Sequence, residues 1–291
     1  MNPVKRSLIT LHLTVVLLGG TALFSHLIPL NATDITIGRS VFACLALFIY
    51  LLWTGESLKL ARSRDYFTAF GLGALMAAHW VSYFAAMQYA SISVGLIALF
   101  TFPVITVFME PFFEAVKLKW QDVVSAIVVL TGIYLLVPTP DLNNNITLGV
   151  AIGIASAILY SLRNLLHRQY FSHYGGAKAM AWQILVICIV LIPVGSSELT
   201  DLSIPTGLLL ATLGTLFTAL PHALIANSLI YLRAKTFSLI ACMQPLYGVF
   251  LAVVLLNETP ELTTLLGGLL IISASIYETV NTGRSHQQEV G

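Results

Sequence analysis

Among the ionisable side chains that lie within apolar stretches of this sequence, four are candidates for function: Arg39, His79, Glu110 and His222. A charge held within hydrocarbon costs about 3 kcal/mol on insertion scales, so a residue of this kind is a functional candidate. An arginine can hold a carboxylate through its planar fork, and a histidine can exchange a proton near neutral pH. A carboxylate with a raised pKa can also carry a proton. These residue types could therefore bind an acidic small molecule and move protons.

Arg39 is expected in the outer half of a helix over residues 34–53. At that depth its guanidinium group could bind a substrate carboxylate from the outer half of a central site. The alternative is structural, because a long side chain could extend outward towards Asp34 or donate to helix carbonyls. The sequence leaves both interpretations open.

Glu110 follows Pro103 by seven residues, roughly 10 Å of helix, and so falls in the inner half of the same span. There it is a candidate for carrying a coupling proton. The other interpretation is an interfacial residue near the helix end that reaches cytoplasmic water. Direct pairing with Arg39 is not expected, because the two residues lie at different depths.

Histidine and aromatic residues gather on the third helix of each half of the chain. His79 and His222 are expected at matched depth near the centres of their spans. Each could hydrogen-bond a substrate and exchange a proton, or could simply be an interhelical hydrogen-bond partner. The predicted substrate-binding set is Arg39, His79, Trp80, Tyr83, Tyr160, His222 and Gln244. Lesser candidates are Asn164, Trp182 and Gln183.

The elements that must position these residues are transmembrane helices. Charged residues make up 9% of the 291 positions, against roughly 25% in a soluble protein, and hydrophobic residues make up 57%. The apolar residues fall in runs of about 20, the length that crosses a membrane as a helix. The predicted helices cover 8–28, 34–53, 66–88, 91–113, 120–137, 147–169, 178–194, 206–231, 236–256 and 262–280. The chain is thus expected to be an all-α integral membrane protein of ten transmembrane helices, with no soluble domain.

The basic residues are distributed unevenly between the two sides of this arrangement. All but one of the 14 Lys and Arg residues fall on or near the side of the N-terminus, Arg163 among them, and Arg39 is the exception. In the connections on the opposite side, all of the charged residues are acidic. The positive-inside rule then predicts a multi-pass protein of the cell (inner) membrane with both termini in the cytoplasm.

The two halves of the chain resemble each other. Gly95–Phe108 aligns with Phe237–Phe250, which places Pro103 on Pro245. A mid-span proline removes a backbone hydrogen bond, so both are predicted to kink their helices and expose a carbonyl at membrane depth. Because five is an odd number of helices, the second copy must be inverted, as in many secondary transporters. The predicted units are a first repeat over 1–138, a second over 146–282 and a cytoplasmic tail over 283–291.

The sequence lacks the features expected of several other classes of protein. A net charge of +1 without a basic patch argues against nucleic acid as a partner. Cys44, Cys188 and Cys242 lie in separate apolar runs, so no disulfide, metal site or cofactor is expected. The glycines in Gly19-Gly20, Gly71-x-Gly73 and Gly149-x-x-x-Gly153 indicate close helix packing rather than phosphate-binding loops. No enzyme motif is present, so the chain is not expected to be an enzyme.

These features resemble the drug/metabolite transporter (DMT) superfamily, in particular its EamA-type ten-helix transporters. Leu239–Ile276 is similar to that family's pattern of a proline, an apolar helix, a glutamate and a glycine-rich last helix, in Pro245, Glu258 and Gly267-Gly268. In the first half the resemblance rests on Arg39, early in the second helix, and on Pro103.

The first half also departs from the family pattern at two points. Val116 stands where the glutamate would be expected, and Gly19-Gly20 stands where the family often has Trp-Gly. The resemblance implies a central cavity lined by the first, third, fourth, sixth, eighth and ninth helices. It also implies alternating access without ATP.

Taken together, the sequence predicts a secondary transporter of a small metabolite, with the lipid bilayer as its surroundings. Export of amino acids or related amphipathic compounds is favoured, and coupling to protons or facilitated exchange are both left open. The alternatives are a membrane-embedded enzyme, which would need convergent carboxylates or a metal set near one membrane face, and a passive channel.

Overall fold

The computed structural model describes residues 3–113, 117–136, 141, 143–222, 224 and 240–289, with side chains from Ile9 to Tyr277 within those ranges. Every regular element in them is helical. The first half contains α1 (Pro3–Gly20), η1 (Thr21–Leu23), α2 (Phe24–Leu27), α3 (Ala32–Trp53), α4 (Ser63–Tyr89), α5 (Ile92–Leu99), α6 (Phe102–Met109), η2 (Glu110–Phe112) and α7 (Trp120–Leu136). The second half contains α8 (Asn145–Tyr170), α9 (Gly176–Leu191), η3 (Ile192–Val194), η4 (Ser197–Leu199), α10 (Ile204–Gly214), the π turn η5 (Thr215–Ala219), α13 (Gln244–Leu256) and α14 (Leu262–Glu289).

Seven helical stretches in the described residues are long and apolar enough to cross a membrane. Three shorter apolar helices, Trp120–Leu136, Gln244–Leu256 and Leu262–Tyr277, fall where further spans are predicted. The all-helical prediction is confirmed for this part of the chain, whereas the count of ten spans stays a prediction. Much of the predicted helices over 206–231 and 236–256, with Arg233 and Lys235, lies outside the described residues.

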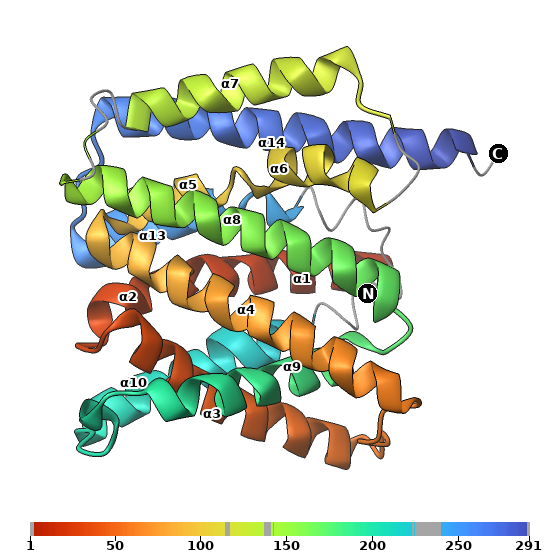
Figure 1. The fold of residues 1–291 in the computed structure, drawn as a ribbon. Helices are drawn as coiled ribbons and strands as arrows, with labels where there is room; N and C mark the ends of the chain where they lie inside the picture. Colours follow the sequence, from red (N-terminus) through yellow and green to blue (C-terminus); the bar gives the residue numbers. More distant parts are fainter. Residues whose placement is uncertain are drawn as a thin grey trace.

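Figure 1 shows the long helices lying side by side in a bundle. α7 and α14 pack together along one edge, and α3, α9 and α10 form the opposite edge. α4, α8, α5, α13 and α1 lie between them. Both chain termini lie at the same end of the bundle, at the right of Figure 1. We call this the terminal end and the other the opposite end.

Short polar side chains start several of the helices. Asn31, Ser91, Asn144 and Ser203 each accept a hydrogen bond from a backbone N–H of the first turn that follows, at the starts of α3, α5, α8 and α10. Such caps satisfy amides that have no partner within the helix. The polar residues between the apolar runs therefore fix where the spans begin.

Small residues bring the central helices into backbone contact. A Cβ added to Gly149 would lie 2.5 Å from the Ala90 Cβ, and one added to Gly153 would lie 2.8 Å from the Ala98 Cβ. Gly73 is similarly enclosed, by Val186 of α9. α8 thus packs closely on α4 and α5, and α4 on α9, which confirms the close helix packing predicted at Gly73, Gly149 and Gly153. Gly71 is different, because a Cβ there would meet nothing within 4 Å.

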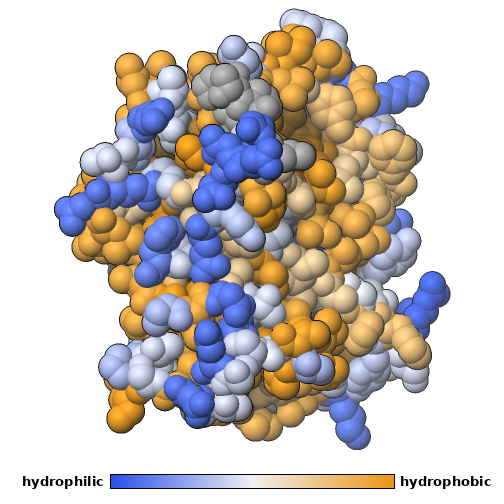
Figure 2. Space-filling view, turned by 60° about the vertical axis from the view of Figure 1, so that its left-hand side comes forward, coloured by the Kyte–Doolittle hydropathy of each residue, from blue (hydrophilic) through white to orange (hydrophobic). Residues whose placement is uncertain are grey.

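The flank of the bundle is apolar. Figure 2 shows wide areas of hydrophobic surface beside a narrower band of hydrophilic residues. Large hydrophobic side chains that face outward include Leu45 and Ile49 of α3, Phe67 of α4 and Leu269 of α14. A continuous apolar flank of this kind suits a hydrocarbon environment rather than water.

The helix that contains Pro103 is interrupted. α5 ends at Leu99, and α6 starts at Phe102 with the proline in its first turn. The carbonyl of Phe100 accepts a hydrogen bond from Ser275 Oγ at 2.8 Å, and that of Phe102 accepts one from Ser161 Oγ at 3.0 Å. Backbone groups freed by the interruption are thus satisfied by neighbouring helices, as membrane depth requires.

Pro245 has a similar setting in the second half. α13 starts at Gln244, with the proline in its first turn, and a turn over Cys242 and Met243 precedes it. Both prolines thus stand just after a break, because a proline fits the first turn of a helix but not its interior.

Asp34 fastens two connections at the opposite end. Its carboxylate is fully buried and accepts hydrogen bonds from the Ser196 N–H at 3.0 Å, from the Ser196 hydroxyl and from the Asn31 amide at 2.6 Å. These bonds tie the start of α3 to the segment after α9. We call this group the Asp34 cluster.

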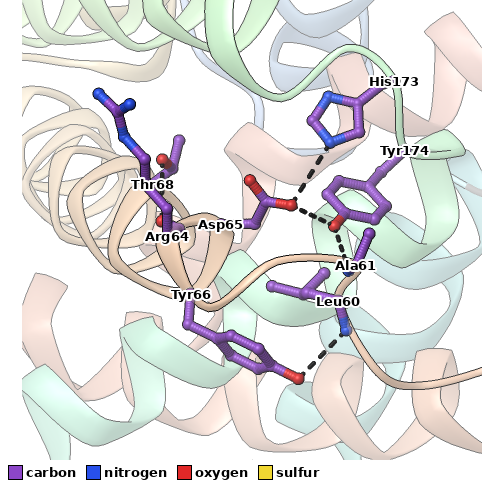
Figure 3. A network of polar contacts seen from close by, with 8 residues as sticks. All are labelled: Leu60, Ala61, Arg64, Asp65, Tyr66, Thr68, His173 and Tyr174. Atoms are coloured by element: carbon purple, nitrogen blue, oxygen red, sulfur yellow. Dashed lines mark hydrogen bonds and ion pairs between the residues drawn. The ribbon is translucent and has the colours of Figure 1, made fainter.

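Asp65 plays the corresponding part at the terminal end (Figure 3). Its Oδ2 accepts a hydrogen bond from the Tyr174 hydroxyl at 2.6 Å, and His173 Nε2 lies 3.6 Å from the same atom. The Tyr174 oxygen in turn accepts the Ala61 N–H at 2.6 Å. This Asp65 cluster ties the α3–α4 connection and the start of α4 to the α8–α9 connection.

Candidate functional site

Arg39 is buried, with 3% of its surface exposed, and its side chain contacts Thr218, Trp80 and Phe84 rather than Asp34. Its backbone carbonyl lies against Gly214, whereas its Nη2 donates to Thr218 Oγ1, four residues further on, at 2.9 Å. The guanidinium carbon stands 3.9 Å from the centre of the Trp80 ring. The alternative in which Arg39 extends towards Asp34 is therefore not what the structure shows.

The π turn η5 presents Thr218 to this arginine. Besides accepting from Arg39, the Thr218 hydroxyl donates to the Leu213 carbonyl at 2.8 Å. The Thr218 carbonyl lies 2.6 Å from His222 Nδ1. One threonine thus links the arginine to the second predicted histidine, and π turns are found frequently at functional sites.

Two buried polar atoms have no hydrogen-bond partner in the described structure, Arg39 Nε and the Tyr83 hydroxyl. Both residues adjoin Phe84, since the guanidinium carbon of Arg39 stands 5.3 Å from the centre of the Phe84 ring and the Tyr83 and Phe84 ring centres are 5.2 Å apart. No carboxylate of the described residues pairs with Arg39. Because a buried charge without a counter-charge is costly, these atoms form a favourable place for an acidic group of a ligand.

His79 joins α4 to α8. Its Nδ1 lies 2.9 Å from Ser156 Oγ and 3.1 Å from the Ser156 carbonyl, and Ser156 Oγ donates to the His79 carbonyl at 3.0 Å. Since the serine proton is used there, Nδ1 must be the donor in the first contact, which leaves Nε2 as the acceptor of a neutral ring. The imidazole stacks on Tyr160 with centroids 4.7 Å apart. The Nδ1 side of the His79 ring therefore joins α4 to α8, whereas Nε2 can accept a hydrogen bond from a ligand or take up a proton.

Arg163 is a further charged group near these residues, and the sequence groups it with the basic residues on or near the side of the N-terminus. It lies half-buried in α8, a candidate span that continues for seven residues to Tyr170. Its Nε and Nη2 donate to Gln183 Oε1 at 2.8 and 2.6 Å, and its Nη1 donates to Asn164 Oδ1 at 2.9 Å. Its position in the same helix, one turn after Tyr160, is the signal that could have identified it.

Glu110 lies apart from these residues. Its side chain is buried directly after α6, and its Oε1 pairs with Arg168 Nη2 at 2.7 Å. This position is near the end of the span, and it matches the expectation that Glu110 does not meet Arg39. Proton coupling through Glu110 stays a prediction.

Gln244 also lies apart from the Arg39 group. Its Nε2 donates to the Leu18 carbonyl at 3.3 Å, and its own carbonyl lies close to Gly19. These contacts join α13 to α1 rather than reach Trp80.

Of the predicted residues, the structure thus connects six through shared contacts and separates Gln244 and Glu110 from them. The connected residues, some of them joined through Thr218 or Phe84, are Arg39, His79, Trp80, Tyr83, Tyr160 and His222. In the described part of the chain, no three His, Cys, Asp or Glu side chains are placed to hold a metal ion.

Comparison with known proteins identifies the family. The sequence profile of the EamA-like transporter family matches residues 5–137 and again residues 147–277. The chain belongs to the EamA-like transporter family. With its apolar helices, this membership makes it a multi-pass membrane protein with a transport function.

Individual relatives agree with this assignment. An uncharacterized transporter, YxxF, of Bacillus subtilis is 22% identical over 92% of this chain and 87% of its own. The threonine/homoserine exporter RhtA of Salmonella typhimurium is 25% identical over 57% of each chain. A solved crystal structure with 14% identity superposes with a TM-score of 0.62 over 94% of this chain and 98% of its own, which shows a shared fold.

Proposed function

We propose that the protein is a secondary transporter that exports amino acids or related amphipathic compounds by alternating access. The observation that carries this proposal is the buried Arg39, whose charge no carboxylate of the described residues compensates and whose Nε is unpaired. A substrate carboxylate would supply both the counter-charge and the missing acceptor. The relation to an amino-acid exporter supports the same substrate class.

The proposal includes a fold of ten transmembrane helices as two inverted repeats. The family profile matches twice, once in each half. α3 packs against α9, α5 against α13 and α7 against α14, and these pairs join corresponding helices of the two halves. α8 lies against α5 and α6 as α1 lies against α13. This exchange of equivalent partners supports a pseudo-two-fold relation, which in a five-helix unit implies inverted topology.

We also place the terminal end in the cytoplasm of a cell (inner) membrane. The α3–α4 connection at that end carries Lys59 and Arg62, and the connections at the opposite end carry acidic residues such as Asp141, Glu198 and Glu258. This distribution follows the positive-inside rule.

Counterflow in reconstituted vesicles tests the transport proposal. Vesicles loaded with an unlabelled amino acid should accumulate the labelled compound transiently and saturably, with threonine, glutamate and phenylalanine as first probes. Arg39→Lys, which keeps the charge but loses the planar fork, should lower counterflow about tenfold. Arg62→Lys, at an exposed position, is the matched control and should leave counterflow unchanged.

Three results would contradict the proposal. Unchanged counterflow by the Arg39→Lys protein would remove Arg39 from the substrate site. Flux without saturation or counterflow would indicate a passive channel. Recovery of a chemically altered solute would indicate a membrane-embedded enzyme.

A further inference from the structure

Arg163 is a second guanidinium group without a carboxylate partner in the described structure. In the described structure, its hydrogen bonds to oxygen go to the neutral amides of Gln183 and Asn164. Amide oxygens satisfy the N–H donors but leave the positive charge uncompensated. The nearby Gln183 is fully buried, so this charge is held inside the bundle rather than at its surface.

Arg39 and Arg163 lie on opposite sides of His79 along the bundle. α4 and α8 are antiparallel, since Gly149 meets Ala90 and Ser156 meets His79. Arg163 follows Ser156 by seven residues, about 10 Å along α8. Arg39 instead contacts Trp80 and Phe84, beyond His79 in the other direction.

Both arginines nevertheless adjoin the central histidines. Arg39 is joined to His222 through Thr218, and Arg163 lies one turn after Tyr160, whose ring stacks on His79. The two positive charges thus lie on either side of one region, and together they favour a ligand with more than one negative group.

Two buried carboxylates of the described residues are engaged elsewhere. Asp34 is held by Ser196 and Asn31, and Glu110 is paired with Arg168. Neither can neutralise the arginines in this conformation. An amino acid with one carboxylate would compensate only one of the two charges, whereas a second acidic group would compensate the other.

We propose that Arg163 is a second substrate-binding residue, and that the substrates are amino acids or related metabolites with two acidic groups. One acidic group of the substrate accepts a hydrogen bond from the unpaired Nε of Arg39. The other takes the place of Gln183 Oε1 as the acceptor of the hydrogen bonds from Nε and Nη2 of Arg163. The orphan Tyr83 hydroxyl can accept a hydrogen bond from the substrate ammonium. This inference rests on the proposed transport function and narrows its substrate class.

Glutamate and glutamine provide a matched pair of probes, because they differ by one acidic group and have nearly the same size. In counterflow by the unmodified protein, the half-saturation concentration for glutamate should lie at least about tenfold below that for glutamine. Arg163→Gln should remove this preference by raising the half-saturation concentration for glutamate about tenfold more than that for glutamine. Arg163→Lys should retain part of the preference, because it keeps the charge.

Arg64→Gln is the matched control, since Arg64 is exposed in the first turn of α4 and should keep the full preference. Elution of each variant as a single species in detergent, together with intact glutamine counterflow, distinguishes a loss of selectivity from a loss of folding. The inference is overturned if the unmodified protein handles glutamine as well as glutamate, or if Arg163→Gln affects both to the same extent. If neutral amino acids counterflow and acidic ones do not, the proposed transport function stands and this inference falls. If no amino acid counterflows, both fall.

Discussion

The two ends of the bundle are each fastened by a buried aspartate, but with different donors. In the Asp34 cluster, the carboxylate accepts hydrogen bonds from a backbone N–H, a hydroxyl and a side-chain amide, and the aspartate is fully buried. In the Asp65 cluster, the Asp65 carboxylate accepts a hydrogen bond from the hydroxyl of Tyr174. It also lies near the imidazole of His173, a side chain that is 54% exposed. Side chains at the surface reorganise more easily than backbone donors do. We therefore expect the terminal end to open more readily than the opposite end.

Tyr174 connects the parts of the weaker cluster. Desolvation and the hydrogen bond to the Asp65 carboxylate raise the pKa of Tyr174 above its usual value. The phenol therefore stays protonated near neutral pH and keeps donating to Asp65. The difference between the ends is thus one of exposure and side-chain mobility, and neither cluster depends on ionisation of this phenol.

The largest effect is expected for Asp34→Ala. This change leaves the Ser196 and Asn31 donors without an acceptor in a buried site, which should cost about 3 kcal/mol of stability. The measurement is the free energy of unfolding of the protein in detergent. Glu198→Ala, at an exposed position in the same connection, is the control and should change stability by less than about 0.5 kcal/mol. Equal losses in the two variants would show that the Asp34 cluster does not fasten this end.

A smaller, local effect is expected for Tyr174→Phe. The variant loses the hydroxyl that donates to Asp65 and accepts from Ala61, so the Ala61 amide should exchange its hydrogen about tenfold faster. Amide hydrogen exchange followed by mass spectrometry measures this change. Tyr170→Phe, at an exposed position at the end of α8, should leave the exchange unchanged. If exchange at the opposite end rises equally, the two ends are not independent and the comparison fails.

The smallest effect is expected for His173→Ala. The imidazole is 3.6 Å from Asp65 and largely exposed, and exposed ion pairs contribute little. Exchange of the Ala61 amide should change by less than about twofold. A change as large as that from Tyr174→Phe would assign the main fastening role to the imidazole–carboxylate contact instead.

Helix positions were predictable where an apolar run met a polar breaker. The expected helix over 34–53 corresponds to α3 (Ala32–Trp53), and that over 66–88 corresponds to α4 (Ser63–Tyr89). Each starts a few residues earlier than predicted, because hydropathy does not register polar first turns. The continuous helix expected over 91–113 is interrupted at Phe100 and Thr101, since Pro103 disturbs the turn before it.

The site was predictable in its residue types but not in its connections. Arg39 and His79 were found because a polar side chain in an apolar run is conspicuous. Arg163 is not conspicuous in this way, because several polar residues surround it in the sequence and it is grouped with the basic residues on or near the side of the N-terminus. Its burial depends on Gln183, 20 residues away on another helix. The bond between Arg39 and Thr218 spans 179 residues and could not be read from local spacing.

The π turn at η5 also sets the rotational phase of the chain that follows it. A π turn contains one residue more than the α-helical turn it replaces, so it offsets the residues after it by about 100° around the helix axis. If all five residues of Thr215–Ala219 formed an ordinary α-helix, His222 would be turned by this angle away from the face that Gly214 presents to Arg39. The direction of His222 therefore depends on the π conformation of this segment and not only on the residues that it contains.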